Sequence, residues 1–432
     1  MIKALLKKIE NKKINIGIIG LGYVGLPLAV EFAKAGFKVC GIDLNKTKVS
    51  KFNKGINYIP DVDTALFKKL VAKGRLKAYT SYSCIKDVDA ISICVPTPLI
   101  KTKEPDMSYI LDAANKLLKY LKPGKIIVLE STTYPGTTEE IILPLLEERG
   151  FKVGKNIFLA FSPERVDPGN RDYKTKNTPK IVGGVTPHCL KVVKALYSKV
   201  INTVIPVSSS RSAEMVKLLE NTFRAVNIGL VNEIAVMCDR LGIDVWEIIE
   251  AASTKPFGFM PFYPGPGLGG HCIPVDPHYL LWKLKTLDYK ARFIELADDI
   301  NTNMPHYIVT KISDTMNSMG KTIKNSTILI LGMAYKKDTD DVRESPAIAI
   351  IDLLLKKGAR VVCNDPFLNS NWKYTGVRNA KLTLQLLKKS ACTVICTNHS
   401  SYDYKKIVKN SQLIIDTRNA TKGIKNSNIV KL

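Results

Sequence analysis

A glycine-rich turn near the start of the chain restricts the fold more than any other feature. The sequence GLGYVG occupies positions 20–25, directly after the apolar run INIGIIG (14–20) and before a helical stretch from Pro27 to Ala35. A second apolar run, FKVCGID, then ends in Asp43. Strand, glycine turn, helix and strand in this order form one βαβ unit, which is the building block of a parallel sheet.

The residues of this turn suit a dinucleotide. Gly20 permits the tight turn, Gly22 lets a pyrophosphate approach the backbone, and Gly25 lets the helix pack on the strand. The helix N-terminus offers unpaired N–H groups to phosphates. Asp43 can accept hydrogen bonds from a ribose 2′-hydroxyl and repels a 2′-phosphate. The turn therefore predicts NAD, in preference to NADP, as the cofactor; the alternative is a glycine turn with only a structural role.

The same alternation of strands and helices extends to about residue 210 and returns near residue 326. In both halves an Asp follows the helix-ending glycine by seven residues, Gly36 before Asp43 and Gly358 before Asp365. We therefore predict an α/β fold with two Rossmann-like, doubly wound parallel sheets. The further predicted strands lie in VDAISICV (88–95), KIIVLEST (125–132), NIFLAFSPE (156–164), KIVGG (180–184), STILILGMAY (326–335), GARVVCNDP (358–366), CTVICTN (392–398) and QLIIDTRN (412–419).

The central segment has a different pattern. Apolar residues recur every three or four positions from Ser212 to Leu241, which predicts one long amphipathic helix whose apolar stripe packs against a partner chain. The stripe consists of Met215, Leu219, Phe223, Val226, Leu230, Ile234 and Met237. A loop rich in Gly and Pro follows at 255–277, and long loops inside compact chains are usually functional. We expect three domains, at 1–210, 211–318 and 319–432.

The nine cysteines predict one reactive thiol. They lack the dense spacing of a disulfide scaffold, and no CxxC pair suggests a metal site, so we expect most of them to be reduced core residues and no metal. Cys272 differs because it lies in the glycine loop GPGLGGHCIPVDP, where a thiolate has the exposure it needs. Next to a nicotinamide, such a thiolate attacks an aldehyde and forms a thioester after hydride loss. His271 is either its base or only a neighbour.

The charge balance argues against a nucleic-acid partner. Lys+Arg number 64 and Asp+Glu 39, so the net charge is +25, but the basic residues are mostly dispersed lysines. Proteins that bind nucleic acid use clustered arginines, so we expect no nucleic-acid partner here and a lysine-rich solvated surface. No apolar run approaches the ~20 residues of a membrane span. The charged N-terminus does not resemble an export signal, so we expect a cytoplasmic location and no membrane partner.

Together, these motifs resemble one family. GLGYVGLPLA, STTYPGTT, SPERVDPG (162–169), the Lys217/Asn221 helix, GLGGHCIPVDP and GMAYKKDTDDVRES are similar to the UDP-glucose/GDP-mannose dehydrogenases, in the same order over residues 14–420. The stretch KPFGFMPFYPGPGLGGHCIPVDP looks most like the UDP-N-acetylglucosamine 6-dehydrogenase branch. The resemblance implies an N-terminal NAD domain, a dimerising central helix and a C-terminal nucleotide-sugar domain. It also implies that a primary alcohol at C6 is oxidised twice to a carboxylate, for surface polysaccharide synthesis.

The resemblance also implies residue roles. Cys272 matches the nucleophile, Lys217 and Asn221 the pair that stabilises an oxyanion, and Asp276 the carboxylate that works with Lys217 on proton transfer. Glu164 matches a residue that helps thioester hydrolysis. Further substrate contacts are expected from Gly269 and Lys336, and further cofactor contacts from Tyr23, Val24, Pro96, Thr97, Thr132 and Arg343, with Thr132 also holding a water near the reaction. From periodicity alone, Lys217 would be read as a solvated lysine.

The exact sugar stays open at this stage. Two positions near Cys272 differ from the UDP-glucose enzymes: Val275 replaces a Lys and His271 replaces a Ser. In addition, Arg165 to Pro168 replace an apolar run and a Glu of those enzymes. These departures fit a pocket for a bulkier 2-substituent, such as N-acetyl. UDP-N-acetylmannosamine, UDP-glucose or UDP-galacturonate precursors are alternatives, with GDP-mannose less favoured. A two-electron hydroxyacid-type dehydrogenase would not need Cys272, and a non-catalytic NAD or UDP-sugar sensor is the alternative from another class.

Overall fold

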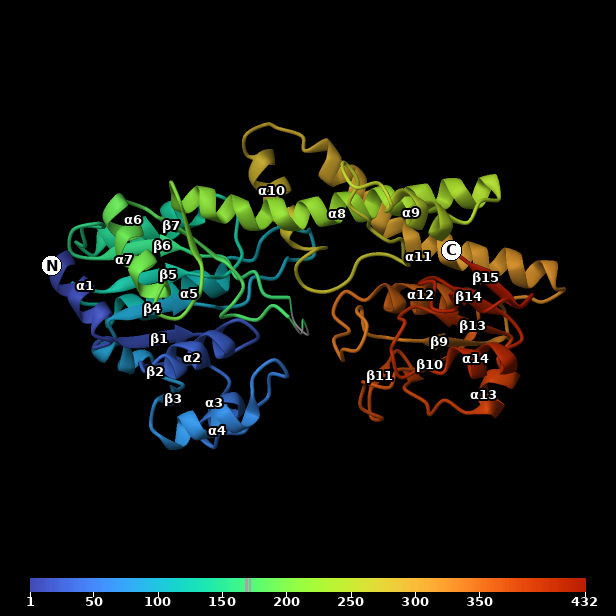
Figure 1. Cartoon of the computed structure of the whole chain (residues 1–432), viewed down its shortest axis with the longest axis horizontal. Coiled ribbons are helices and arrows are strands. Elements are labelled where there is room, and N and C mark those ends of the chain that lie inside the picture. Colours follow the sequence, from blue (N-terminus) through green and yellow to red (C-terminus); the bar gives the residue numbers. More distant parts are fainter. Residues whose placement is uncertain (168–169, 171) are drawn as a thin grey trace. The chain divides into compact units, whose positions relative to one another are not determined.

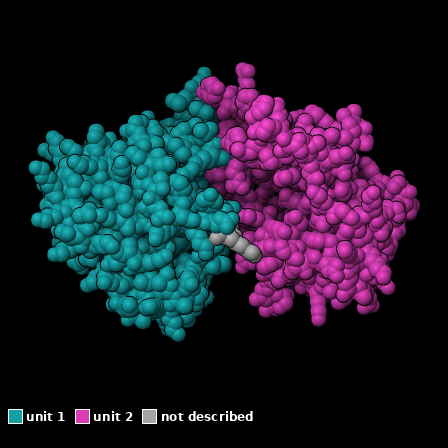
Figure 2. All heavy atoms as spheres, viewed as in Figure 1, with its two compact units in different colours: residues 1–220, 278–288 teal, residues 221–277, 289–432 magenta. Residues whose placement is uncertain are grey.

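The chain divides into two compact units in the computed structural model, which describes residues 1–167, 170 and 172–432 (Figures 1 and 2). Unit 1 consists of residues 1–220 and 278–288, and unit 2 of residues 221–277 and 289–432. Both units contain part of the segment 211–318, so the predicted three-domain division stays a prediction.

Unit 1 is built on one eight-stranded sheet. Its order across the sheet is β3-β2-β1-β4-β5-β6-β7-β8, and neighbouring strands are parallel except for the antiparallel pair β6 and β7. The glycine turn follows β1, at the point where strand order reverses, which is where ligands bind in open α/β sheets. In chain order the strands are β1 (Asn15–Ile19), β2 (Lys38–Ile42), β3 (Leu76–Tyr79), β4 (Ala90–Ile93), β5 (Ile126–Leu129), β6 (Phe158–Phe161), β7 (Lys180–Gly184) and β8 (Val204–Val207).

Helices cover both faces of this sheet, which explains why its central strands read as continuous apolar runs. In β5, for example, Ile126 and Val128 join a core with α1, α2 and α7, whereas Ile127 and Leu129 join a second core with α5 and α6. The helices are α1 (Ile2–Glu10), α2 (Gly25–Lys34), α3 (Lys46–Asn53), α4 (Thr64–Ala72), α5 (Ser108–Leu118), α6 (Leu143–Glu148) and α7 (Pro187–Tyr197), with a 3-10 helix η1 (Tyr82–Asp87) and a π-helical turn η2 (Thr138–Ile142).

The predicted parallel sheet is confirmed, and it departs from parallel pairing at one position. β7 runs antiparallel to β6, with Phe161 opposite Gly183. The described residues between these strands contain no helix, and a parallel connection needs a crossover, usually a helical one. The start of β7 therefore lies at the same edge of the sheet as the carboxyl ends of β4, β5 and β6.

The predicted long helix is confirmed as α8 (Ser210–Leu241). Its apolar stripe is largely exposed in the single chain: Leu219 is 58% exposed, Leu230 53%, and Phe223 and Met237 46% each. Ala235 and Cys238, on another face, are buried in the core of unit 2. The stripe is thus exposed in the single chain, and its packing against a partner chain stays a prediction.

Unit 2 contains a five-stranded parallel sheet in the order β10-β9-β13-β14-β15. In β9, Ile328 and Ile330 pack with α11 and α12, whereas Leu329 and Leu331 pack with α13 and α14. The segment 255–275 contains no helix or strand, as its Gly and Pro content predicted. The elements of unit 2 after α8 are α9 (Val245–Ala252), α11 (Arg292–Ser318), β9 (Thr327–Leu331), α12 (Pro346–Lys356), β10 (Arg360–Asn364), β11 (Lys373–Tyr374), β12 (Val377–Arg378), α13 (Leu384–Lys389), β13 (Cys392–Ile395), α14 (Tyr404–Asn410), β14 (Ile414–Asp416) and β15 (Ile429–Lys431). Helix α10 (Asp276–Lys285) begins in unit 2, but most of its residues belong to unit 1.

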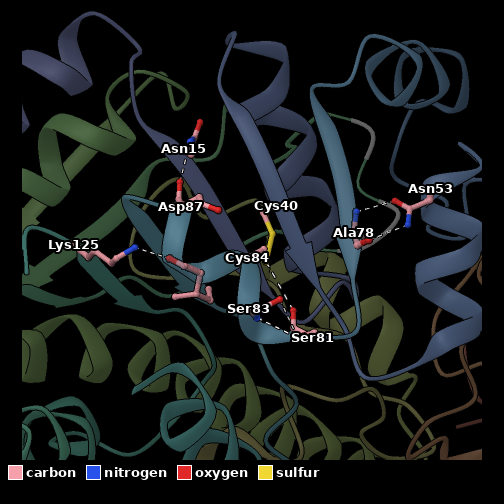
Figure 3. The surroundings of a disulfide bond; sticks show 10 residues. Asn15, Cys40, Asn53, Ala78, Ser81, Ser83, Cys84, Asp87 and Lys125 are labelled. Atoms are coloured by element: carbon pink, nitrogen blue, oxygen red, sulfur yellow. Dashed lines mark hydrogen bonds between the residues drawn. A yellow bond between two sulfur atoms is a disulfide. The ribbon is translucent and has the colours of Figure 1, made fainter. Parts of the chain in front are cut away.

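The cysteines follow the prediction with one exception. Cys40 on β2 and Cys84 in η1 form a disulfide, although 44 residues separate them (Figure 3). The expectation that most of the cysteines are reduced holds, and this pair is the exception, because spacing along the chain does not reveal that η1 returns to β2. The other cysteines are buried thiols apart from Cys272, whose thiol is exposed.

Candidate active site

The glycine turn has the geometry that a dinucleotide needs. Gly20 adopts a φ of 91°, and a Cβ atom there would come within 2.4 Å of the Cys94 carbonyl oxygen. A Cβ atom on Gly25 would lie 1.8 Å from the Gly20 oxygen, whereas one on Gly22 would meet nothing within 4 Å. The first and last glycines are therefore required by close packing, and the middle one leaves open space for an approaching phosphate at the start of α2.

Asp43 lies at the carboxyl end of β2 and is tied to the turn. Its Oδ2 accepts the Leu21 N–H at 3.0 Å, and its Oδ1 accepts the Asn45 N–H at 2.9 Å. A carboxylate at this place suits a ribose diol and disfavours a 2′-phosphate. The other expected cofactor contacts in unit 1 surround the same edge: Tyr23 and Val24 precede α2, Pro96 and Thr97 follow β4, and Thr132 follows β5. These residues fit NAD.

Glu164 follows β6 at this edge of the sheet. Its Oε1 accepts the backbone N–H groups of Arg165 and Val166, each at 2.8 Å. Arg165 in turn donates Nε at 3.2 Å and Nη2 at 2.5 Å to the two carboxylate oxygens of Glu220, which lies on α8. The Glu164 loop is thereby tied to the helix that carries Lys217. Pro168 and Gly169 of the same motif lie outside the described residues.

The loop around Cys272 forms a tight turn into α10. The N–H groups of Val275 and Asp276 both donate to the Cys272 carbonyl oxygen, at 3.1 and 2.7 Å. Asn221 Nδ2 donates to Asp276 Oδ2 at 2.5 Å, and both side chains are buried. Unit 2 thus connects three groups through hydrogen bonds of neighbouring residues: the exposed Cys272 thiol loop, the buried Asp276 carboxylate and the buried Asn221 amide.

Lys217 lies on α8 one turn before Asn221, so the two side chains share a helix face. Its side chain is buried, with 8% of the residue exposed, so the interpretation of a solvated lysine does not hold. A buried cation and an oriented amide are the kinds of group that stabilise an oxyanion.

The glycines before Cys272 pack against the charged turn that follows β9. A Cβ atom on Gly269 would lie 2.4 Å from the Tyr335 Cβ atom, and the Gly270 N–H donates to the Arg343 carbonyl oxygen at 2.9 Å. Unit 2 therefore places the thiol loop beside the segment that carries Lys336 and Arg343.

The guanidinium of Arg343 lies against Asp341. Its Nη2 donates to Asp341 Oδ2 at 2.6 Å. Burial raises the pKa of the Asp341 carboxyl, but hydrogen bonds and charge from Arg343 outweigh it and hold that pKa below its ordinary value. His271 acts on Asp341 in the same direction, so this imidazole has a carboxylate neighbour besides its position next to Cys272.

The predicted repeat between the two halves is confirmed at atomic detail. Gly332 after β9 has a φ of 82°, and the N–H of Met333 donates to Asp365 Oδ2 at 2.7 Å. This is the counterpart of Leu21 donating to Asp43. Here, however, the carboxylate is fully buried and also lies 3.0 Å from His399 Nε2.

Sequence reasoning missed a partly buried cation, Arg418, which follows β14. Its Nε donates to the Cys396 carbonyl oxygen at 3.0 Å, and a Cβ atom on Gly265 would come within 2.4 Å of its Nη1. Burial lowers the pKa of this guanidinium. The signal in the sequence was an Arg two residues after an apolar strand, at the edge where α/β sheets bind ligands.

Two absences apply to the part of the chain that the structure describes. None of its helices is long and apolar enough to cross a membrane. It also holds no cluster of three or more His, Cys, Asp or Glu side chains arranged to bind a metal ion.

Comparison with known proteins identifies the family. Models of the UDP-glucose/GDP-mannose dehydrogenase family match in order: the NAD-binding domain at residues 14–201, the central domain at 211–303 and the UDP-binding domain at 329–423. The chain is 34% identical to UDP-N-acetyl-D-mannosamine dehydrogenase of Methanococcus vannielii, over 95% of this chain and 94% of that protein. It is also 34% identical to UDP-N-acetyl-D-glucosamine 6-dehydrogenase of Pseudomonas aeruginosa, over 83% of this chain and 84% of that protein.

A solved structure agrees with these sequence matches. UDP-D-ManNAc dehydrogenase from Pyrococcus horikoshii superposes with a TM-score of 0.88 at 32% identity, over 97% of this chain and 99% of that chain. Since the family models and the relatives cover most of the chain, it belongs to the UDP-glucose/GDP-mannose dehydrogenase family and is an NAD-dependent UDP-sugar dehydrogenase.

Proposed function

We propose that this chain oxidises the C6 alcohol of UDP-N-acetylglucosamine to the carboxylate, as a step in surface polysaccharide synthesis. Per sugar, one water is consumed and two NAD are reduced. The observation that carries the proposal is the exposed Cys272 thiol in a turn beside the buried Asn221–Asp276 pair. A thiol at this place can add to an aldehyde, and the carbon of the resulting thiohemiacetal still carries a hydride to lose in a second oxidation.

The proposed roles follow from the chemistry of each group. The first oxidation takes a hydride from C6 and a proton from the C6 hydroxyl group, and it leaves an aldehyde. The Cys272 thiolate adds to that aldehyde, and loss of a second hydride gives a thioester. Lys217 and Asn221 stabilise the oxyanion, a role in which one donor is worth roughly 3 kcal/mol. Asp276 fixes the Asn221 amide and exchanges protons with Lys217.

Hydrolysis and binding involve the remaining predicted residues. Water adds to the thioester carbon and releases the thiol, with Glu164 assisting and Thr132 holding the water. NAD, when bound, supplies the hydride acceptor, and the glycine turn with Asp43 holds it. In unit 2, Lys336 and the backbone at Gly269 contact the nucleotide-sugar, and Arg343 contacts the cofactor.

UDP-N-acetylmannosamine is the second candidate substrate. Relatives named for that sugar cover 94–96% of the chain, whereas those named for N-acetylglucosamine cover 83% of it. Both sugars carry the N-acetyl group that the departures at Val275 and His271 fit. They differ only in configuration at C2, and a few contacts in the pocket decide between them.

We also propose that two copies of the chain pair through the exposed stripe on α8. Leu219, Phe223 and Leu230 present a continuous row of large apolar side chains at helical spacing. Exposed apolar patches of this kind mark interaction sites.

The decisive experiment measures NADH formed from a panel of UDP- and GDP-sugars with purified protein and NAD. The expected result is two NADH per molecule of UDP-N-acetylglucosamine, with weaker or no activity on the C2 epimer and on UDP-glucose. A ratio of one would exclude the double oxidation, and preference for the epimer would assign the enzyme to UDP-N-acetylmannosamine. No NADH with any nucleotide-sugar would favour a non-catalytic sensor.

A further inference from the structure

A buried charged network lies inside unit 1, apart from the predicted catalytic side chains. Lys180 Nζ lies 2.8 Å from Glu130 Oε2, and their side chains are only 5% and 0% exposed. The Tyr197 hydroxyl donates to Glu130 Oε1 and lies 3.3 Å from Ser92 Oγ. The ammonium also lies 5.1 Å from the centre of the Tyr197 ring. Buried charges are costly unless paired and hydrogen-bonded, and here both charges are.

The topology brings this network to the carboxyl edge of the sheet. Glu130 directly follows β5 and precedes Ser131 and Thr132, whereas Lys180 is the first residue of β7. Because β7 is antiparallel to β6, its first residue lies where β5 and β6 end. Ala160 is opposite Gly184 and Phe161 opposite Gly183. Extending this register places Glu164 level with Lys180.

Contacts connect Lys180 with the Glu164 loop. Its ammonium donates to the Pro163 carbonyl oxygen at 3.4 Å. Burial lowers the pKa of Lys180, but the carboxylates of Glu130 and Glu164 outweigh burial, so the pKa lies above its ordinary value. The cation therefore stays protonated in the interior, within the field of the Glu164 carboxylate. A shallow cavity is lined by Glu164, Arg165 and Lys180 among others.

We propose that Glu130, Lys180 and Tyr197 form a positioning network, which fixes the loops after β5 and β6 and thereby holds Thr132 and Glu164 for thioester hydrolysis. The inference rests on the proposed function. In that step the oxygen of water bonds to the acyl carbon, the C–S bond breaks, Cys272 leaves as a thiolate, and the two protons of the water pass to solvent. No electrons are transferred, and the network touches no reacting atom.

The test uses the double variant Glu130→Gln/Lys180→Met in the full chain. Removing both charges avoids the orphaned buried charge that either single change would leave. If the network positions the hydrolytic groups, kcat falls at least ~10-fold while kcat/KM, which reports the steps before hydrolysis, changes by less than ~3-fold. The first turnover still yields two NADH per subunit, and the acyl-enzyme accumulates as a mass increase of the intact protein.

A second variant keeps the inference testable if the double variant does not fold. Tyr197→Phe retains the buried ring and removes only the hydroxyl that donates to Glu130, so kcat is expected to fall ~3-fold or more at constant kcat/KM. The matched control is Tyr374→Phe in unit 2, which removes a tyrosine hydroxyl that donates to Asp352 at 2.9 Å, far along the chain from these loops. The control should leave kcat unchanged.

The outcomes separate the two proposals. The positioning network is overturned if the double variant has wild-type kcat, or if it loses kcat and kcat/KM equally. Where the double variant does not fold, the same criteria apply to Tyr197→Phe. A wild-type enzyme that forms no NADH with any nucleotide-sugar overturns the proposed function itself, and this inference with it.

Discussion

Glu214, near the start of α8, accepts three hydrogen bonds in a buried site. Its Oε2 takes the Gly136 N–H at 2.6 Å, and its Oε1 takes the N–H and the hydroxyl of Thr138 at 2.9 and 2.6 Å. These bonds fix the segment after Thr132 against the helix that carries Lys217. The substitution Glu214→Gln retains the shape of this side chain and removes its titration.

The sign and size of the effect follow from the pKa. Burial raises the pKa of Glu214 from 4.5 to about 7, although its hydrogen bonds oppose the rise. A carboxyl group with a higher pKa in the folded state holds its proton more tightly when folded. The free energy of unfolding therefore falls as pH rises from about 4.5 to 7 and levels off above that range, by about 3 kcal/mol in total.

The assay compares thermal and denaturant unfolding of wild type and Glu214→Gln between pH 5 and pH 8. The amide does not titrate, and its NH2 group cannot accept the Gly136 N–H, which costs about 1 kcal/mol at every pH. At pH 5 wild type should have a larger free energy of unfolding than Glu214→Gln, and this difference should vanish or reverse by pH 8. The difference in Tm between the two proteins should therefore change by roughly 6–12 °C for a unit of this size. Glu148→Gln, at an exposed position, is the control. A wild-type-to-variant difference that is constant from pH 5 to pH 8 would refute the reasoning.

Three further changes test the site and the surface. Cys272→Ala should lower acid formation by about 10³-fold or more while NAD binding, followed by calorimetry, changes less than twofold; turnover near wild type would remove the nucleophile assignment. Asp43→Asn should shift the ratio of NAD to NADP affinity by at least ~10-fold toward NADP, because the repulsion of a 2′-phosphate is lost; an unchanged ratio would contradict the ribose role. Leu219→Arg, at a 58% exposed position, should leave a folded but monomeric chain in light scattering, and a dimer of unchanged affinity would exclude the α8 stripe as the interface.

Local patterns were sufficient for the glycine turn and for the strands beside it. Gly20 and Gly25 are required by contacts with residues that the βαβ order already places nearby, so spacing alone predicts them. Asp43 follows for the same reason. Periodicity also predicted α8, but it could not tell whether the stripe lies in a core or on a surface, since both need the same spacing. The structure answers that question, because Leu219 and Phe223 are exposed in the single chain.

Features that depend on long-range pairing escaped the sequence. Lys180 begins an apolar run and is indistinguishable there from a solvated lysine at a strand end. Its ion pair with Glu130 exists because β7 reverses direction, and nothing in the spacing of the strands reveals that reversal. The Cys40–Cys84 bond escaped in the same way. The hydrogen bond between Asn221 and Asp276 escaped as well, since the family resemblance implied only that Asp276 works with Lys217.

The second glycine turn has a consequence for engineering. In unit 1 the acidic residue after the turn is half-buried, whereas in unit 2 the chain itself occupies the equivalent carboxylate: Met333, Ala334 and His399 all bind Asp365. The turn after β9 thus has the backbone of a dinucleotide site, but groups of the chain itself bind its Asp. The carboxylate is therefore not open to a ribose. Converting this turn into a second dinucleotide pocket would first require the removal of His399, and glycines added between positions 333 and 337 would not suffice.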